Sequence, residues 1–157
     1  MLNVRNITPN FATELDCKHQ ILELSTEELE ELMTLVARRG VVLARQQTMN
    51  KQQQVDLAYR LGEPLLKPNN ASGLPSELIR IKSDSDSQYA AGQMWHSDVS
   101  SDPEPPSLSM LRMEIVPEAG GDTVFADMYQ ALETLSKPIQ ALLRTLNAYH
   151  TPKAHYL

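Results

Sequence analysis

The segment between Ser25 and Gly40 places the strongest single constraint on how this chain of 157 residues can fold. Ser25 and Glu28 match a capping box, in which each side chain bonds to the backbone N–H of the other residue. Apolar residues then recur at helical spacing, at Leu29, Leu32, Met33 and Val36. Gly40 supplies a helix stop. The segment therefore predicts an amphipathic helix whose apolar face must be buried against other elements.

The residues after this helix predict an α+β order of elements. Residues 40–44 indicate a short buried strand, and Thr48 is placed to cap a second helix that Gly62 and Pro64 end. After a loop over 65–76, rich in Pro, Asn, Gly and Ser, we predict strands over 77–82, 94–99, 108–116 and 123–126. Asp127 is placed to cap a third helix, and Ser136-Lys137-Pro138 to begin a fourth that runs to about Asn147. Helices followed by strands and then helices favour one α+β domain over 1–157 rather than alternating βαβ units.

Composition excludes several classes of protein. The net charge is −6 and the basic residues are scattered, which argues against a nucleic-acid partner because phosphate binding needs clustered Lys and Arg. No apolar run approaches the roughly 18 residues of a membrane span, and the first residues lack the apolar run of a signal peptide. Cys17 is the single cysteine, which excludes an internal disulfide and fits a reducing compartment. We expect a cytoplasmic protein that binds neither nucleic acid nor membrane.

The His96-Ser97-Asp98 sequence is the candidate site. Residues at i and i+2 of a strand share one face, with Cα atoms about 6.6–6.8 Å apart, so an imidazole and a carboxylate can converge on one metal. Two histidines and one carboxylate form the facial triad of non-haem iron(II) oxygenases. By itself the His-x-Asp pattern more often marks a surface pair, or an acid that only orients a histidine, than a metal site.

The surroundings of this motif resemble the taurine dioxygenase family. The similar segments span most of the chain: Arg39-Gly40-Val41-Val42-Leu43, Leu61-Gly62-Glu63-Pro64, Trp95-His96-Ser97-Asp98-Val99, 120–129, Leu135-Ser136-Lys137-Pro138 and Ala148-Tyr149-His150. The resemblance implies a partial double-stranded β-helix, or jelly-roll, with flanking helices. It also implies an iron(II)/2-oxoglutarate-dependent dioxygenase.

The resemblance also assigns roles to individual residues. It implies that His96 and Asp98 are iron(II) ligands and that Thr123 holds the distal carboxylate of 2-oxoglutarate. Read from the residue alone, Thr123 is equally a β-branched strand residue. The substrate would be a small, anionic organic molecule, hydroxylated with O2 while 2-oxoglutarate becomes succinate and carbon dioxide. Trp95, Val99 and Lys67 are its expected contacts, although Trp95 also suits a core position.

The chain also departs from the family pattern. The third iron ligand, a histidine, and the arginine that pairs with 2-oxoglutarate belong to later strands, so we expect a truncated domain without its C-terminal strands and with impaired activity. Residues 64–68 and Ser100-Ser101 differ from the pattern of sulfonate-using relatives, which makes taurine itself doubtful as the substrate.

Two other interpretations remain open. One is a non-catalytic protein that keeps residues 95–98 as a folding or partner-binding surface. The other is a small metal-binding β-domain in which His150 or His155 joins His96 and Asp98. A homo-oligomer is compatible with each interpretation.

Overall fold

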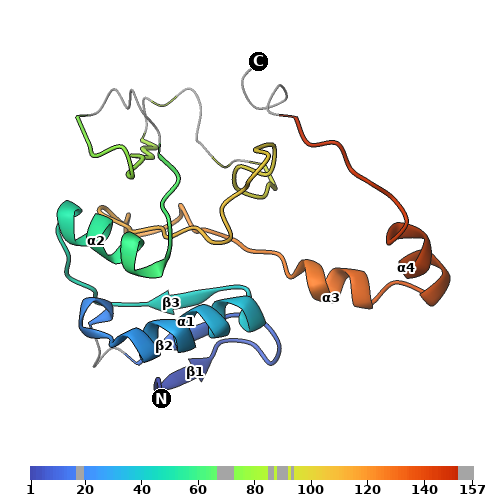
Figure 1. The fold of residues 1–157 in the computed structure, drawn as a ribbon, viewed down its shortest axis with the longest axis horizontal. Helices are drawn as coiled ribbons and strands as arrows, with labels where there is room; N and C mark the ends of the chain where they lie inside the picture. Colours follow the sequence, from blue (N-terminus) through green and yellow to red (C-terminus); the bar gives the residue numbers. More distant parts are fainter. Residues whose placement is uncertain (17–19, 67–72, 85–86, 88–91, 93, 152–157) are drawn as a thin grey trace. The chain divides into compact units, whose positions relative to one another are not determined.

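A computed structural model describes residues 1–16, 20–66, 73–84, 87, 92 and 94–151 (Figure 1). The chain divides into two compact units, which are described separately. The first unit comprises Met1–Gln53 and Arg112–Ala148, and the second comprises Gln54–Leu111 and Tyr149–Leu157.

The first unit contains a three-stranded sheet in the order β1-β2-β3. Strand β1 (Val4–Asn6) pairs antiparallel with β2 (Thr13–Leu15), and β2 pairs parallel with β3 (Val42–Ala44). A parallel pair needs a crossover connection, which here contains the short 3-10 helix η1 (Ile21–Glu23) and helix α1 (Thr26–Arg39). The predicted order of helices before strands was therefore wrong, because β1 and β2 precede α1 and the chain begins with a β-hairpin and a βαβ unit.

Helix α1 confirms the prediction made from its capping residues. The Ser25 side chain accepts the Glu28 N–H at 3.3 Å, and Glu28 accepts the Ser25 N–H at 2.9 Å, which satisfies two N–H groups that the first turn leaves without partners. Gly40 ends the helix with φ +74°, in a region that favours glycine. The predicted strand directly after it is confirmed as β3.

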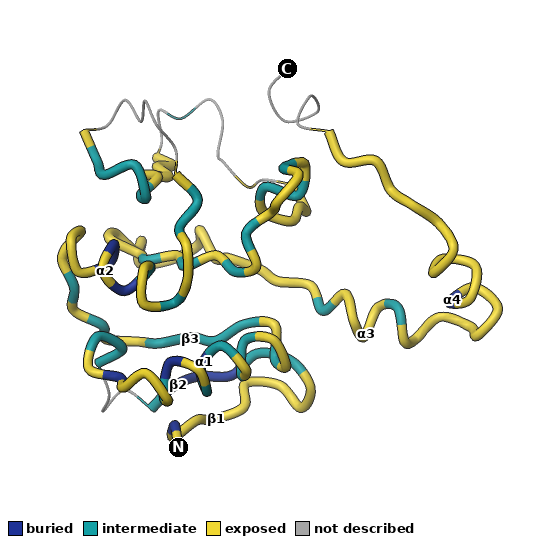
Figure 2. Tube along the Cα trace, viewed as in Figure 1, coloured by how far each residue is buried: buried dark blue, intermediate teal, exposed yellow. Residues whose placement is uncertain are grey.

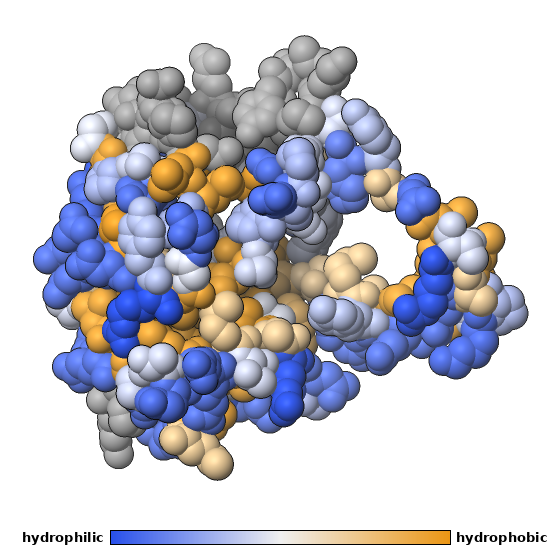
Figure 3. Space-filling model, viewed as in Figure 1, coloured by the Kyte–Doolittle hydropathy of each residue, from blue (hydrophilic) through white to orange (hydrophobic). Residues whose placement is uncertain are grey.

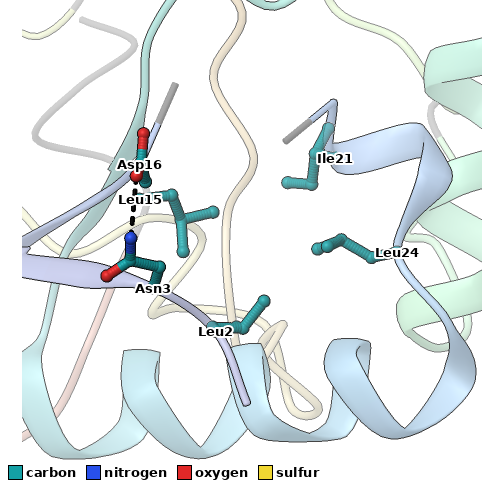
Figure 4. Close-up of a pocket in the computed structure, with 6 residues that line it drawn as sticks. All are labelled: Leu2, Asn3, Leu15, Asp16, Ile21 and Leu24. Carbon is teal, nitrogen blue, oxygen red and sulfur yellow. Dashed lines mark hydrogen bonds between the residues drawn. The ribbon is translucent and has the colours of Figure 1, made fainter. Parts of the chain in front are cut away.

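The apolar core of the first unit joins α1, the sheet and η1. Its buried residues are Leu2, Leu15, Leu24, Leu29 and Leu32, which lie in the dark blue parts of the trace in Figure 2. Three of these leucines and Ile21 line a small gap whose polar edge is the hydrogen bond from Asn3 to Asp16, 2.8 Å long (Figure 4). The lining is mostly aliphatic, so this gap is a packing feature of the core and offers a ligand few polar groups.

Glu14 is a buried acid in the middle of the sheet. Its carboxylate lies 2.6 Å from Arg5 Nη2 and 3.0 Å from Arg45 Nε. The hydrogen bond from Arg5 is the largest influence on its pKa; with the charges of Arg5 and Arg45 it outweighs the opposing effect of burial and lowers that pKa below the ordinary value.

Arg39, the last residue of α1, forms hydrogen bonds with the segment that connects β1 to β2. Its guanidinium donates to Thr13 Oγ1 at 2.9 Å and to the carbonyl oxygens of Thr8 and Pro9 at 2.7 and 2.8 Å. It also donates to the Ala12 carbonyl oxygen at 3.0 Å. One planar donor group therefore holds several backbone carbonyls of a turn that has no regular structure.

Helix α2 (Lys51–Leu61) confirms the predicted second helix, but the predicted cap at Thr48 was wrong. The Asn50 side chain accepts the Gln53 N–H at 2.9 Å, and Gln53 Oε1 accepts the Asn50 N–H at 2.8 Å. Asparagine is a stronger N-cap than threonine, and Gln53 three residues later completes a reciprocal pair.

The last two helices were predicted close to where they lie. Helix α3 (Met128–Glu133) begins after Asp127, whose carboxylate accepts the Gln130 N–H at 3.0 Å. Helix α4 (Lys137–Leu143) follows Ser136 and carries its proline in the first turn, but it ends before the predicted Asn147. Among the helices of the described residues, none combines the length and apolar character that a membrane crossing needs.

The four later strands that the sequence predicts are absent from the structure. Residues 77–82, 94–99, 108–116 and 123–126 are all described, and none of them is a strand. A strand requires a hydrogen-bonded neighbour, and these segments find none among the described residues. Their apolar side chains are exposed instead, including Ile79, Leu111, Ile115, Val116, Val124 and Phe125. Figure 3 shows further apolar side chains at the surface of the segment that carries α3 and α4.

Candidate metal centre

His96 and Asp98 lie in the second unit, in an irregular segment rather than on the predicted strand. Residues 98–101 form a turn, closed by the hydrogen bond from the Asp102 N–H to the Val99 carbonyl oxygen at 3.0 Å. The two side chains nevertheless converge, because His96 Nε2 lies 3.2 Å from Asp98 Oδ1. Local contacts bring the imidazole and the acid together where a strand was expected to do so.

The His96 ring is oriented by its own backbone segment. Nδ1 lies 2.8 Å from the carbonyl oxygen of Met94. A carbonyl only accepts, so Nδ1 carries the hydrogen and Nε2 is the nitrogen that faces Asp98. Metal-binding histidines are commonly fixed in this way, with one ring nitrogen donating to a carbonyl and the other left for the metal.

Asp98 divides its two carboxylate oxygens between two partners. Oδ1 faces His96, and Oδ2 accepts a hydrogen bond from Ser109 Oγ at 2.6 Å. The side chains of His96 and Asp98 are 40% and 53% exposed, so the pair is open to solvent and to small molecules.

The spacing of these donors fits a shared metal ion. Two ligands at about 2.1 Å from one ion lie about 3.0 Å apart in adjacent octahedral positions and about 3.4 Å apart in tetrahedral ones. The separation of Nε2 and Oδ1, 3.2 Å, falls between these values. The same separation is also that of an ordinary contact between a histidine and an aspartate, so it does not by itself require a metal ion.

A third protein ligand does not join this pair in the described part of the chain. Within that part, no three His, Cys, Asp or Glu side chains gather closely enough to hold a metal ion. This contradicts the hypothesis that His150 completes the site, since its Nδ1 lies 3.0 Å from Ser100 Oγ. Cys17, His19 and His155 fall outside the described residues.

The remaining predicted site residues have varied surroundings. Trp95 is 71% exposed, so it does not lie in a core formed by the described residues. Val99 is half-buried with φ +50°, and Thr123 is exposed in the first unit. Lys67 falls outside the described residues. The roles of these residues toward substrate and 2-oxoglutarate stay predictions.

Sequence reasoning missed the residues that support the pair. Ser109 is 11 positions from Asp98, and His150 is 50 positions from Ser100, so no short spacing pattern reveals either contact. The only available signal was the polar residue at position 109 between the apolar Leu108 and Met110.

The sequence profile of the taurine catabolism dioxygenase TauD, TfdA family matches residues 3–157 of the chain. The chain belongs to this family. Among its TauD/TfdA relatives, an alpha-ketoglutarate-dependent sulfonate dioxygenase of Saccharomyces cerevisiae is 34% identical over 97% of this chain and 40% of its own length. An alpha-ketoglutarate-dependent sulfate ester dioxygenase of Pseudomonas putida is 30% identical over 99% of this chain and 51% of its own length.

A solved TauD/TfdA structure agrees with these relationships. The crystal structure of a taurine dioxygenase from Burkholderia xenovorans superposes with a TM-score of 0.79 at 27% identity, over 96% of this chain and 55% of that one. The chain therefore spans about half the length of the relatives that it matches.

Proposed function

We propose that this chain carries the iron(II)-binding part of a 2-oxoglutarate-dependent dioxygenase that hydroxylates a small organic anion. The observation that carries the proposal is the convergence of His96 Nε2 and Asp98 Oδ1 at 3.2 Å, in a chain of the TauD/TfdA family. When bound, iron(II) would supply the activation of O2 and the oxidative decarboxylation of 2-oxoglutarate.

His96 and Asp98 have complementary tasks at such a site. The contact between Nδ1 and the Met94 carbonyl oxygen makes Nε2, the nitrogen that faces Asp98, the one that would bind a metal ion. The Asp98 carboxylate supplies negative charge, which reduces the net charge of a bound divalent cation. We assign the hydroxyl of Thr123 to the distal carboxylate of 2-oxoglutarate, and Trp95, Val99 and Lys67 to the substrate.

The rest of the site would lie in the part of the relatives that this chain does not match. We propose that the third ligand, a histidine, and an arginine for 2-oxoglutarate belong there, together with the strands that complete a double-stranded β-helix. The segments 94–99, 108–116 and 123–126, which are not strands in the described part of the chain, support this view because their exposed apolar side chains suit a covering sheet. These 157 residues by themselves are then expected to be weakly active or inactive.

The proposed substrate class follows from the relatives and the charge pattern. Two relatives are named for sulfonates and sulfate esters, whose substrates are anions. Lys67 is a cation in the segment where this chain departs from the family pattern, and an ammonium group attracts such an anion.

The test measures metal binding and turnover separately. Mn(II) binding is followed by electron paramagnetic resonance, and Fe(II)-dependent release of succinate from 2-oxoglutarate is followed by chromatography. His96→Ala and Asp98→Ala should each weaken Mn(II) binding strongly and abolish any succinate release, while His150→Ala should weaken Mn(II) binding far less than either. Wild-type protein that is well folded and monodisperse yet binds no Mn(II) would instead favour a non-catalytic interaction module.

A further inference from the structure

The turn that begins at Asp98 has a backbone conformation that its own sequence disfavours. Val99 has φ +50°, and a β-branched residue rarely adopts a positive φ. Such a conformation persists where the surrounding contacts impose it, and these places cluster at functional sites. The hydrogen bond between Asp102 and Val99 closes the turn but does not fix the Asp98 side chain.

Two contacts from distant segments hold this turn on either side of Val99. Before it, Ser109 Oγ donates to Asp98 Oδ2 at 2.6 Å. After it, Ser100 Oγ lies 3.0 Å from His150 Nδ1. All of these residues belong to the second unit, so the contacts lie within one compact body.

The Ser109 contact determines which way the carboxylate faces. An aspartate on an exposed turn otherwise exchanges among staggered side-chain rotamers and rotates freely about its terminal bond. With Oδ2 held by Ser109, Oδ1 stays directed at His96 Nε2. Fixing both ligands before a metal ion arrives removes an ordering cost from binding.

We propose that Ser109 is a positioning residue for the metal-binding carboxylate of Asp98, and that His150 supports the same turn through Ser100. The inference rests on the proposed function only in naming a metal ion as the ligand. The orientation of Asp98 toward His96 can be measured without one.

The main experiment compares Ser109→Ala, which removes the hydroxyl, with Ser109→Thr, which keeps it. Ser107→Ala is the matched control, because Ser107 is also an exposed serine but has no side-chain hydrogen bond among the described residues. Nitrogen-15 NMR of the His96 ring in metal-free protein reports its contact with Asp98. The dissociation constant for Mn(II), from electron paramagnetic resonance, reports the metal site.

Ser109→Ala should shift the His96 ring signals and weaken Mn(II) binding by about 10- to 100-fold, the usual effect of removing a partner of a metal ligand. Ser109→Thr and Ser107→Ala should leave both measurements near the wild-type values. His150→Ala should shift the His96 ring signals and weaken Mn(II) binding in the same direction as Ser109→Ala, by a smaller amount. His150→Asn places an amide near the position of Nδ1, so both measurements should return to near the wild-type values.

Unchanged ring signals in Ser109→Ala, or equal changes in Ser107→Ala, would overturn the proposal. If Ser109→Ala does not fold by circular dichroism, the His150→Ala and His150→Asn pair decides, and failure of His150→Asn to restore the signals counts against the proposal. If the wild-type protein binds no Mn(II) while Ser109→Ala still shifts the ring signals, the proposed function fails and the positioning role of Ser109 stands.

Discussion

Gly40→Ala should destabilise the first unit more than any other single methyl addition at a glycine of the described chain. A Cβ at position 40 would lie 2.3 Å from Cε2 of Phe11 and 3.0 Å from its Cδ2, well inside van der Waals contact. Gly40 also has φ +74° at the end of α1, which an L-residue adopts only with strain.

The expected cost has two parts. The left-handed backbone contributes about 1–2 kcal/mol for a residue that carries a Cβ. Displacing the half-buried Phe11 ring adds an overpacking cost of about 1–3 kcal/mol. The sum is about 2–5 kcal/mol, which for a protein of this size corresponds to a fall in Tm on the order of 10 °C.

Urea unfolding followed by circular dichroism measures both parts. Gly120→Ala is the control for the backbone, since Gly120 has φ +76° and no heavy atom within 4 Å of an added Cβ. In a Phe11→Ala background the collision disappears, so Gly40→Ala should then cost only about 1–2 kcal/mol. An equal cost of Gly40→Ala with and without the Phe11 ring would refute the assignment of the collision.

Three further perturbations test other contacts. Asn50→Ala should lower the free energy of thermal unfolding by about 1 kcal/mol, because it removes the N-cap of α2. An equal decrease in Thr48→Ala would instead favour Thr48 as the cap. The hydrogen bond from Arg5 lowers the pKa of Glu14 in the folded protein. The ionised Glu14 side chain therefore contributes its full stabilisation of the fold above the ordinary pKa near 4.5, and this contribution disappears as the pH falls through the lower folded-state pKa. Glu14→Gln should remove this acid-dependent part of the urea stability curve, so an unchanged curve contradicts the role of the ion pair. Arg39→Lys should lower the free energy of unfolding by about 1.5–3 kcal/mol and speed proteolysis between residues 7 and 12, because an ammonium group cannot reach the separate carbonyls that the guanidinium holds. Proteolysis of this variant at the wild-type rate would contradict the role of Arg39 in holding the turn.

The elements that the sequence predicts correctly are those whose signals are local. Ser25, Glu28 and Gly40 lie within one helix and its ends, so the capping pattern determines α1 without knowledge of the rest of the fold. Strands β1 and β2 were missed because each has three residues and no alternating pattern. Glu14 lies in the middle of β2 and is buried only because Arg5 and Arg45 neutralise it, which depends on pairing between distant segments.

The candidate site was predictable only in its residue types. The spacing of His96 and Asp98 correctly suggested that the two side chains converge, but the expected route through a strand was wrong. Their orientation comes from a backbone carbonyl and from Ser109, and the second of these lies 11 positions away. Contacts of this kind follow from chain folding and leave no spacing pattern to recognise.

The segment 108–113 is not a strand, yet its side chains alternate between half-buried and exposed positions as the strand prediction requires. Leu108, Met110 and Arg112 are half-buried, whereas Ser109, Leu111 and Met113 are exposed. The two-residue alternation of a strand is therefore present, although the segment pairs with no neighbouring strand among the residues that the structure describes. The exposed side of this alternation includes the serine that holds Asp98 and two apolar side chains that need covering. The covering strand that we propose for this side would bury Leu111 and Met113. We therefore propose that the same added sheet covers the apolar surface and supplies the third ligand.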